Sequence, residues 1–129
     1  IDEEKLSLLK EIMKSHYVMV EYGVESVYDE TLKRINRGHD FETAKNAICL
    51  THEYGLPCGA HFIFGLPGES REMMIKSADI ISELPLTTVK FHQLQIFKDT
   101  MMAEEYLANP EGIGSAEKRA DVTQRTYII

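Results

Sequence analysis

A strand that ends abruptly in two glycines constrains the fold of this chain more than any other feature. Residues 61–70 read His-Phe-Ile-Phe-Gly-Leu-Pro-Gly-Glu-Ser, so an apolar strand gives way to a turn and then to a residue that can cap a helix. Ligands of α/β proteins bind at the carboxyl ends of parallel strands, where glycine lets the backbone approach them closely. A sharp strand-to-helix turn also requires Gly and Pro for steric reasons alone. The run therefore predicts an α/β turn, and a ligand site only in combination with other motifs.

The length and charge of the chain restrict the kind of protein it belongs to. With 129 residues it fits one domain, but it is shorter than the roughly 200 residues that a closed α/β barrel needs. Its 14 basic and 21 acidic residues give a net charge of −7, which favours solubility and does not indicate a nucleic-acid surface. The apolar runs are too short to span a membrane, and no signal peptide is recognisable. We expect a cytoplasmic parent protein.

The two cysteines and the first residue give further information about the class of protein. Cys49 and Cys58 are too few for a disulfide framework, and their separation matches no common pair of metal ligands. We therefore expect both thiols to be core residues and assign no metal ligand. Because the sequence begins with Ile1 rather than Met, we expect it to be part of a longer protein.

Hydrophobic periodicity predicts three strands that alternate with helices. Gly38 is expected to end the second helix, Asp40 and Ser70 to cap the next two, and Pro85 to stop the fourth. On the fourth helix, the expected inward residues are Met73, Met74, Ala78 and Ile81. The expected strands cover residues 18–22, 58–64 and 89–97, and the expected helices cover 2–16, 29–36, 41–54, 70–84, 101–107 and 115–127, with a turn at 109–112.

This alternation predicts a parallel sheet with right-handed crossovers. We expect the three strands to lie side by side in their chain order, with helices packed on one face. Parallel sheets normally have both faces covered, and this chain has helices for only one. A segment of an α/β barrel would satisfy this pattern, because its other face would form part of the barrel lumen.

Four motifs stand in order along the chain. They are Glu21-Tyr-Gly-Val-Glu-Ser26, Arg34-Ile-Asn-Arg-Gly-His-Asp40, Phe62-Ile-Phe-Gly-Leu-Pro-Gly-Glu69 and Lys90-Phe-His-Gln-Leu-Gln-Ile-Phe-Lys-Asp-Thr100. Together they resemble the radical S-adenosylmethionine (SAM) superfamily over roughly residues 18–103. The closest resemblance is to an uncharacterised bacterial Fe-S oxidoreductase family, which is related to the oxygen-independent coproporphyrinogen III oxidases and to the elongator-type and methylthiotransferase radical enzymes.

The resemblance implies a fold and a chemistry. Such enzymes have a partial (β/α)6 barrel of the TIM type, in which a Cys-x3-Cys-x2-Cys loop after the first strand holds a [4Fe-4S] cluster. An electron from a donor such as flavodoxin or ferredoxin reductively cleaves SAM to methionine and a 5′-deoxyadenosyl radical. This chain contains no such triplet. We therefore expect residues 1–129 to be one domain, the later half of the barrel with strands four to six, inactive alone and with the cluster ligands upstream.

The resemblance also implies which residues bind SAM. Glu25 corresponds to a polar position that hydrogen-bonds SAM, where a carboxylate accepts from the α-ammonium group or the ribose hydroxyls, and Glu21 is a second candidate. Arg37 corresponds to an arginine that holds the methionine carboxylate, which suits its planar fork. His61 occupies a position that is an acidic ribose ligand in coproporphyrinogen oxidases.

The resemblance also implies which residues contact the adenine of SAM. It assigns no catalytic residue. Ile63 is expected to pack on the adenine face, and the backbone near Gln95 and Ile96 to pair with the adenine edge. Gly65 and Gly68 would let the backbone pass close to the ligand. Three basic side chains either face the lumen and the substrate or extend into solvent, namely Lys90, His92 and Lys98.

Two other interpretations belong to different functional classes. The chain could be a self-contained Rossmann- or flavodoxin-like module that binds a nucleotide phosphate at its glycine turn. It contains neither Gly-x-Gly-x-x-Gly nor Gly-Lys-Ser/Thr, which counts against that interpretation. It could also be a non-catalytic interaction domain in which every motif only shapes a turn. A cysteine triplet in the sequence upstream of the chain would decide in favour of the radical SAM interpretation, for which the substrate stays unknown.

Overall fold

The computed structural model describes residues 1–109 and the backbone of residues 126–128, and in these residues helices and strands alternate. No helix within these ranges is both long and apolar enough to cross a membrane. The elements in chain order are α1 (Glu3–Met13), β1 (Val20–Glu25), α2 (Asp29–Arg34), α3 (Phe41–Glu53), β2 (Cys58–Phe64), α4 (Arg71–Ser82), β3 (Thr88–Gln93), β4 (Gln95–Phe97), α5 (Met101–Ala108) and β5 (Thr126–Ile128).

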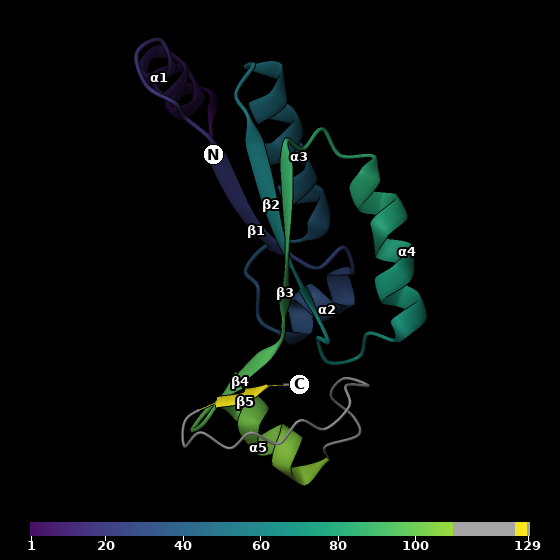
Figure 1. Cartoon of the computed structure of the whole chain (residues 1–129). Coiled ribbons are helices and arrows are strands. Elements are labelled where there is room, and N and C mark those ends of the chain that lie inside the picture. Colours follow the sequence, from purple (N-terminus) through teal and green to yellow (C-terminus); the bar gives the residue numbers. More distant parts are fainter. Residues whose placement is uncertain (110–125, 129) are drawn as a thin grey trace.

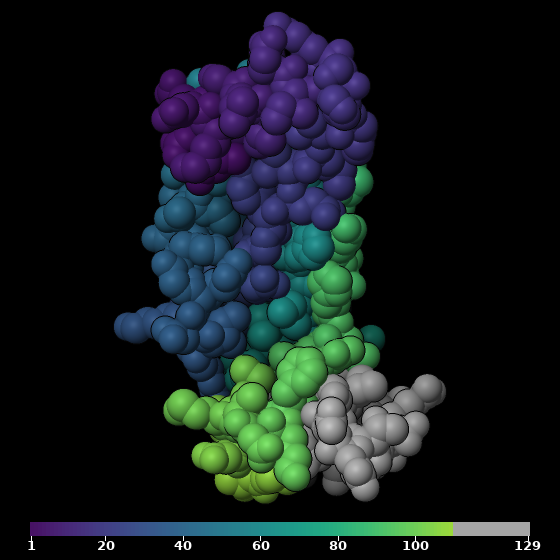
Figure 2. Space-filling view, turned by 90° about the vertical axis from the view of Figure 1, so that its left-hand side faces the viewer, coloured from purple at the N-terminus to yellow at the C-terminus, as the bar shows by residue number. Residues whose placement is uncertain are grey.

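The centre of the fold is a three-stranded parallel sheet in the order β1-β2-β3. This arrangement confirms the predicted strand order and direction. Helices α3 and α4 lie on one side of the sheet (Figure 1). The opposite face is open, and in Figure 2 its three strands lie side by side between α1 above and β4 and α5 below. The open α/β arrangement agrees with the predicted fold class.

The two faces of the sheet differ because successive side chains of a strand point to opposite sides. On the helix side, Val24, Ala60 and Phe62 are nearly inaccessible to solvent and pack with Ile48 of α3 and Ile81 of α4. The alternate positions, which include Glu21, His61 and Lys90, face the open side. The apolar core therefore lies between the sheet and its helices.

Helix α2 ends two residues earlier than predicted. Its end is a Schellman motif, in which the N–H of Asn36 donates to the carbonyl of Lys33 at 3.1 Å and the N–H of Arg37 donates to Leu32 at 2.9 Å. Asn36 takes the left-handed conformation that the motif requires, with φ +56°. The prediction that Gly38 ends this helix was therefore wrong, because asparagine tolerates left-handed backbone better than most residues.

The caps of α3 and α4 were predicted correctly. Asp40 accepts from the N–H of Thr43 at 2.8 Å, and Ser70 accepts from the N–H of Met73 at 3.2 Å. One inward residue of α4 was wrong, because Ala78 is exposed while Ser77 is buried. Ser77 and Ile81 are four residues apart and therefore share the helix face that packs inward. Ala78, which directly follows Ser77, points away from that face.

The first and third predicted strands were wrong in their bounds. The first extends from Val20 to Glu25 instead of covering residues 18–22. The third splits at Leu94, whose N–H donates to the Phe64 carbonyl at 2.9 Å and whose side chain is buried. Beyond this break, β4 pairs antiparallel with β5, so the structure replaces the predicted helix over 126–127 with a strand. The rest of that helix, and the predicted turn beyond residue 109, lie outside the described residues.

A second, smaller apolar cluster lies at the carboxyl end of the sheet. It comprises Leu66 of the turn after β2, Leu94, Ile96 of β4 and Ala103 of α5. Partly buried Ile63 packs against this cluster. The cluster therefore connects the glycine turn with the segment after β3.

We expect the Cys58 thiol to react only after the chain unfolds. Its side chain is 1% exposed, it donates to the Pro85 carbonyl at 3.5 Å, and burial raises the pKa of its thiol. In a Cys49→Ser variant, titration with a disulfide reagent should find almost no reactive thiol in buffer and one per chain in urea. A Cys58→Ala variant leaves only half-buried Cys49, which should react faster. Equal native rates for the two thiols would contradict this assignment.

Candidate functional site

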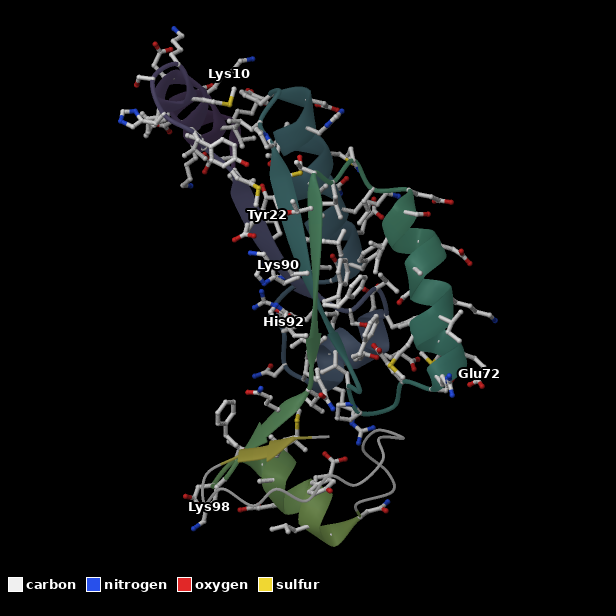
Figure 3. All side chains as sticks on the ribbon, in the orientation of Figure 1. Lys10, Tyr22, Glu72, Lys90, His92 and Lys98 are labelled. Carbon is white, nitrogen blue, oxygen red and sulfur yellow. The ribbon has the colours of Figure 1, made fainter. Side chains whose placement is uncertain are left out.

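Polar side chains from all three parallel strands meet on the open face of the sheet. The strand register places Gly23 of β1 beside His61 of β2, and His61 beside Lys90 of β3. Figure 3 shows Lys90 and His92 on the side away from α3 and α4. These two side chains, for which the sequence left two orientations open, therefore face the side that would form the barrel lumen.

Glu21 is the acidic centre of this row. Its carboxylate accepts from Nζ of Lys90 at 2.5 Å and lies 3.4 Å from Nε2 of His61. The Lys90 ammonium group holds the pKa of the Glu21 carboxyl below its usual range, and the nearby His61 contributes in the same direction. Glu21 therefore stays ionised in neutral solution and balances one cation of the row.

His61 and His92 form a stacked pair. Their ring centroids lie 5.1 Å apart, and Nε2 of His92 is 3.1 Å from Nδ1 of His61, which is a hydrogen-bond distance. The other ring nitrogen of His61, Nε2, is buried and has no hydrogen-bond partner among the described residues. A buried polar atom without a partner calls for an explanation, because such atoms are rare in folded proteins.

Arg37 lies against the carboxyl end of β1. Its Nη2 and Nε donate to the Gly23 carbonyl at 2.6 Å and 3.2 Å, and Nη2 is 3.8 Å from the Glu25 carboxylate. The Arg37 side chain is 38% exposed and that of Glu25 is 21% exposed. The structure therefore brings together two of the predicted SAM ligands, Glu25 and Arg37, and fixes the guanidinium through the strand backbone.

Gly23 is a residue of this site that sequence reasoning did not assign. A Cβ at this position would lie 2.6 Å from the Glu25 carboxylate and 2.9 Å from Nη2 of Arg37. Real Cβ atoms do not approach other atoms so closely, so a side chain at this position would push both flexible charged groups away from where they lie. The available signal was a glycine inside a strand, which often marks a close approach.

Glu25 itself has a strained backbone. Its φ is +72°, and the N–H of Ser26 donates to the Val24 carbonyl at 3.0 Å across it, which indicates a tight three-residue turn. Such strain costs about 1–3 kcal/mol in a residue other than glycine and is typical of functional sites. The hydroxyl of Ser26 donates to the buried carboxylate of Glu69, which joins this turn to the turn after β2.

The other predicted site residues lie further along the carboxyl edge. Ile63 is partly buried against the second cluster, and Ile96 is 1% exposed within it. The backbone of Gln95 and Ile96 pairs with β5. Gly65 and Gly68 both have left-handed φ values, +87° and +90°, so the turn after β2 requires glycine there.

Gly68 does not lie with the lumen residues. It lines a cleft of about 430 Å³ between α2 and the start of α4, together with Tyr28, Arg34 and Met73. This cleft is open to solvent and contains none of the charged residues of the sheet face, so we place the candidate site on the sheet face instead. Within the described residues, no group of three or more His, Cys, Asp or Glu side chains is arranged to hold a metal ion.

Comparison with known proteins identifies relatives of the chain. Residues 1–81 match the Radical SAM superfamily. The chain is 37% identical over 82% of its length to the uncharacterized protein MJ0486 of Methanocaldococcus jannaschii, of which it covers 33%. It is 35% identical over 84% of its length to the protein YhcC of Escherichia coli K12, of which it covers 35%. The chain thus spans about a third of the length of these two relatives.

A tRNA uridine(34) acetyltransferase of Dehalococcoides mccartyi is 38% identical over 51% of the chain, which covers 14% of that protein. Among solved structures, the archaeal Methanocaldococcus infernus Elp3 with an N-terminal deletion (1–46) superposes with a TM-score of 0.71 at 29% identity. That match covers 83% of this chain and 25% of the other. The parallel strands and their helices are therefore part of a TIM-barrel-like core. The chain belongs to the radical SAM superfamily.

Proposed function

We propose that this chain supplies the SAM-binding strands of a radical SAM enzyme, and that Glu25 and Arg37 hold the methionine part of SAM. The observation that carries the proposal is the position of the Arg37 guanidinium, which is fixed to the Gly23 carbonyl on the open face at the carboxyl end of a parallel strand. Substrates and cofactors of barrel enzymes bind at this end of the strands. Some N–H groups of the guanidinium donate to no described residue, and they could donate to a carboxylate of the ligand.

The neighbouring groups support the same orientation of the ligand. Glu25 would accept from the α-ammonium group of SAM, because that cation is the natural partner of a carboxylate beside an arginine. Ile63 and Gly65 would then border the adenine, as the motifs predict. When bound in the parent protein, the [4Fe-4S] cluster supplies the electron that cleaves SAM. Its ligands are expected outside this chain.

The finer class of the parent enzyme stays a prediction. The motifs predict an Fe-S oxidoreductase related to the oxygen-independent coproporphyrinogen III oxidases, located in the cytoplasm and reduced by a flavodoxin or ferredoxin. The relatives include proteins named tRNA uridine(34) acetyltransferase. We do not extend a tRNA substrate to this chain, because its net charge of −7 does not favour phosphate binding.

The proposal predicts that Glu25→Gln weakens SAM binding in the full-length, anaerobic protein. Loss of a charged hydrogen-bond partner costs about 1.5–3 kcal/mol, so we expect an affinity lower by about 10-fold to about 100-fold in calorimetry. Glu30→Gln is the matched control, because Glu30 is an exposed residue of α2 that lies outside the sheet face. Equal affinities of the two variants would rule out Glu25 as a SAM ligand.

A further inference from the structure

We propose that Glu21, His61 and His92 form a hydrogen-bond relay that sets the tautomer of His92, so that Nδ1 of His92 can accept a proton from a polar group of the substrate. The three side chains come from three adjacent strands and share the open face of the sheet. His92 would be the catalytic residue, and Glu21 and His61 would be positioning residues. The role toward the substrate rests on the proposed function, whereas the relay itself does not.

The Glu21 carboxylate selects the tautomer of His61. It lies 3.4 Å from Nε2 of His61, close enough for a hydrogen bond after a small rotation of either side chain. An unprotonated Nε2 would hold its lone pair close to the negative carboxylate, which is repulsive. A proton on Nε2 would instead be attracted, and it would give this buried nitrogen the partner that it lacks. His61 therefore carries its proton on Nε2.

This choice determines the tautomer of His92. A neutral imidazole has one donor and one acceptor nitrogen, so Nδ1 of His61 is an acceptor when Nε2 carries the proton. The 3.1 Å contact then requires a proton on Nε2 of His92, which donates to His61. Nδ1 of His92 is consequently the unprotonated, basic nitrogen. His92 is exposed on the open face, and its Nδ1 has no hydrogen bond among the described residues.

The charges of the row allow this nitrogen to be protonated. Lys90 forms an ion pair with Glu21, so the row of Glu21, Lys90, His61 and His92 has no net charge when both imidazoles are neutral. In the proposed step, an O–H or N–H bond of the substrate breaks, its electron pair stays on the substrate atom, and Nδ1 of His92 gains the proton. The resulting imidazolium donates to His61, whose Nε2–H faces the Glu21 carboxylate. The proton then leaves to water.

The relay is tested by locating the ring protons in the full-length protein labelled with ¹⁵N-histidine. Nitrogen–proton spectra distinguish protonated from unprotonated ring nitrogens, and His61→Gln and His92→Gln variants assign the signals. We expect protons on Nε2 of both rings and a through-hydrogen-bond coupling between Nε2 of His92 and Nδ1 of His61. A proton on Nδ1 of His61, or the absence of that coupling, would overturn the relay.

Two variants distinguish the effect of the Glu21 carboxylate on the His61 tautomer from the effect of Lys90. In Glu21→Gln, the amide no longer selects one tautomer, so the single set of His61 signals should be lost. In Lys90→Met, the carboxylate remains and the wild-type tautomers should persist. A His61 tautomer that is unchanged in Glu21→Gln would show that Glu21 does not position the pair.

Chemical modification measures the basic nitrogen directly. Diethyl pyrocarbonate acylates unprotonated imidazole nitrogens, and peptide mapping gives a rate for each histidine. We expect His92 to react and His61 to be protected, and Glu21→Gln to slow the His92 reaction severalfold while exposed His52 of α3 keeps its rate. An unchanged His92 rate would overturn the proposal. Neither measurement uses SAM, so a failed relay and a failed SAM site give different results.

Discussion

SAM binding by the full-length protein is expected to weaken about 30-fold to about 1,000-fold when Arg37 is replaced by alanine. This corresponds to about 2–4 kcal/mol, the loss typical of a truncated partner in a desolvated charge pair. The reason is that the variant leaves the methionine carboxylate without the guanidinium that the Gly23 carbonyl holds in place. Anaerobic calorimetry gives the affinity, and the melting temperature of the same sample without ligand should change little.

Arg34→Ala is the matched control for this variant. Arg34 is an exposed residue at the end of α2, three residues before Arg37, and its partner is Glu105 of α5 rather than a group on the sheet face. Its loss should leave the affinity for SAM close to the wild-type value. If both variants bound SAM equally well, Arg37 would not belong to the site. A large decrease of the Arg37→Ala melting temperature without ligand would make Arg37 a structural residue instead.

The free energy of unfolding is expected to fall by about 2–5 kcal/mol in Ile48→Ala, the largest loss of stability that we predict. Ile48 of α3 is 0% exposed and packs on the sheet with Val24 and Phe62. Alanine at this position removes apolar burial and leaves a cavity that the packed sheet cannot fill. Urea unfolding followed by circular dichroism measures the difference.

Ile75→Ala gives the comparison at an exposed position. Ile75 of α4 is also a helical isoleucine, but 64% of its surface is exposed. Its replacement should change the free energy of unfolding by about 0.5 kcal/mol or less, as at most surface positions. Similar losses for the two variants would mean that α3 does not pack on the sheet as described.

The sequence predicted best those elements whose signal is local. The strand Cys58–Phe64 has the predicted bounds, because a mainly apolar run flanked by Pro57 and Gly65 marks both of its ends. The strand Val20–Glu25 was displaced, because the polar residues of its open face interrupt the apolar pattern. The break at Leu94 depends on contacts with Phe64 and Ile96, which no local pattern reveals. The order of the strands followed from the alternation of elements.

The sequence predicted individual residues of the candidate site but not the contacts between them. The resemblance of four motifs identified Glu25 and Arg37. In the structure, Nη2 of Arg37 lies 3.8 Å from the Glu25 carboxylate. The hydrogen bond between His61 and His92 joins residues 31 positions apart, and it depends on the register of β2 and β3. The role of Gly23 depends on a side chain from another element, so its sequence position alone could not reveal it.

The Schellman motif at the end of α2 makes the length of this helix part of the geometry of the proposed site. Arg37 is the second residue after the helix cap, so its direction depends on the angle at which the helix stops. One residue inserted into α2 would turn that end by about 100°, which would carry the guanidinium away from β1. If Arg37 binds SAM as proposed, the length of this short helix is constrained by the ligand, although an inserted residue itself would contact no ligand.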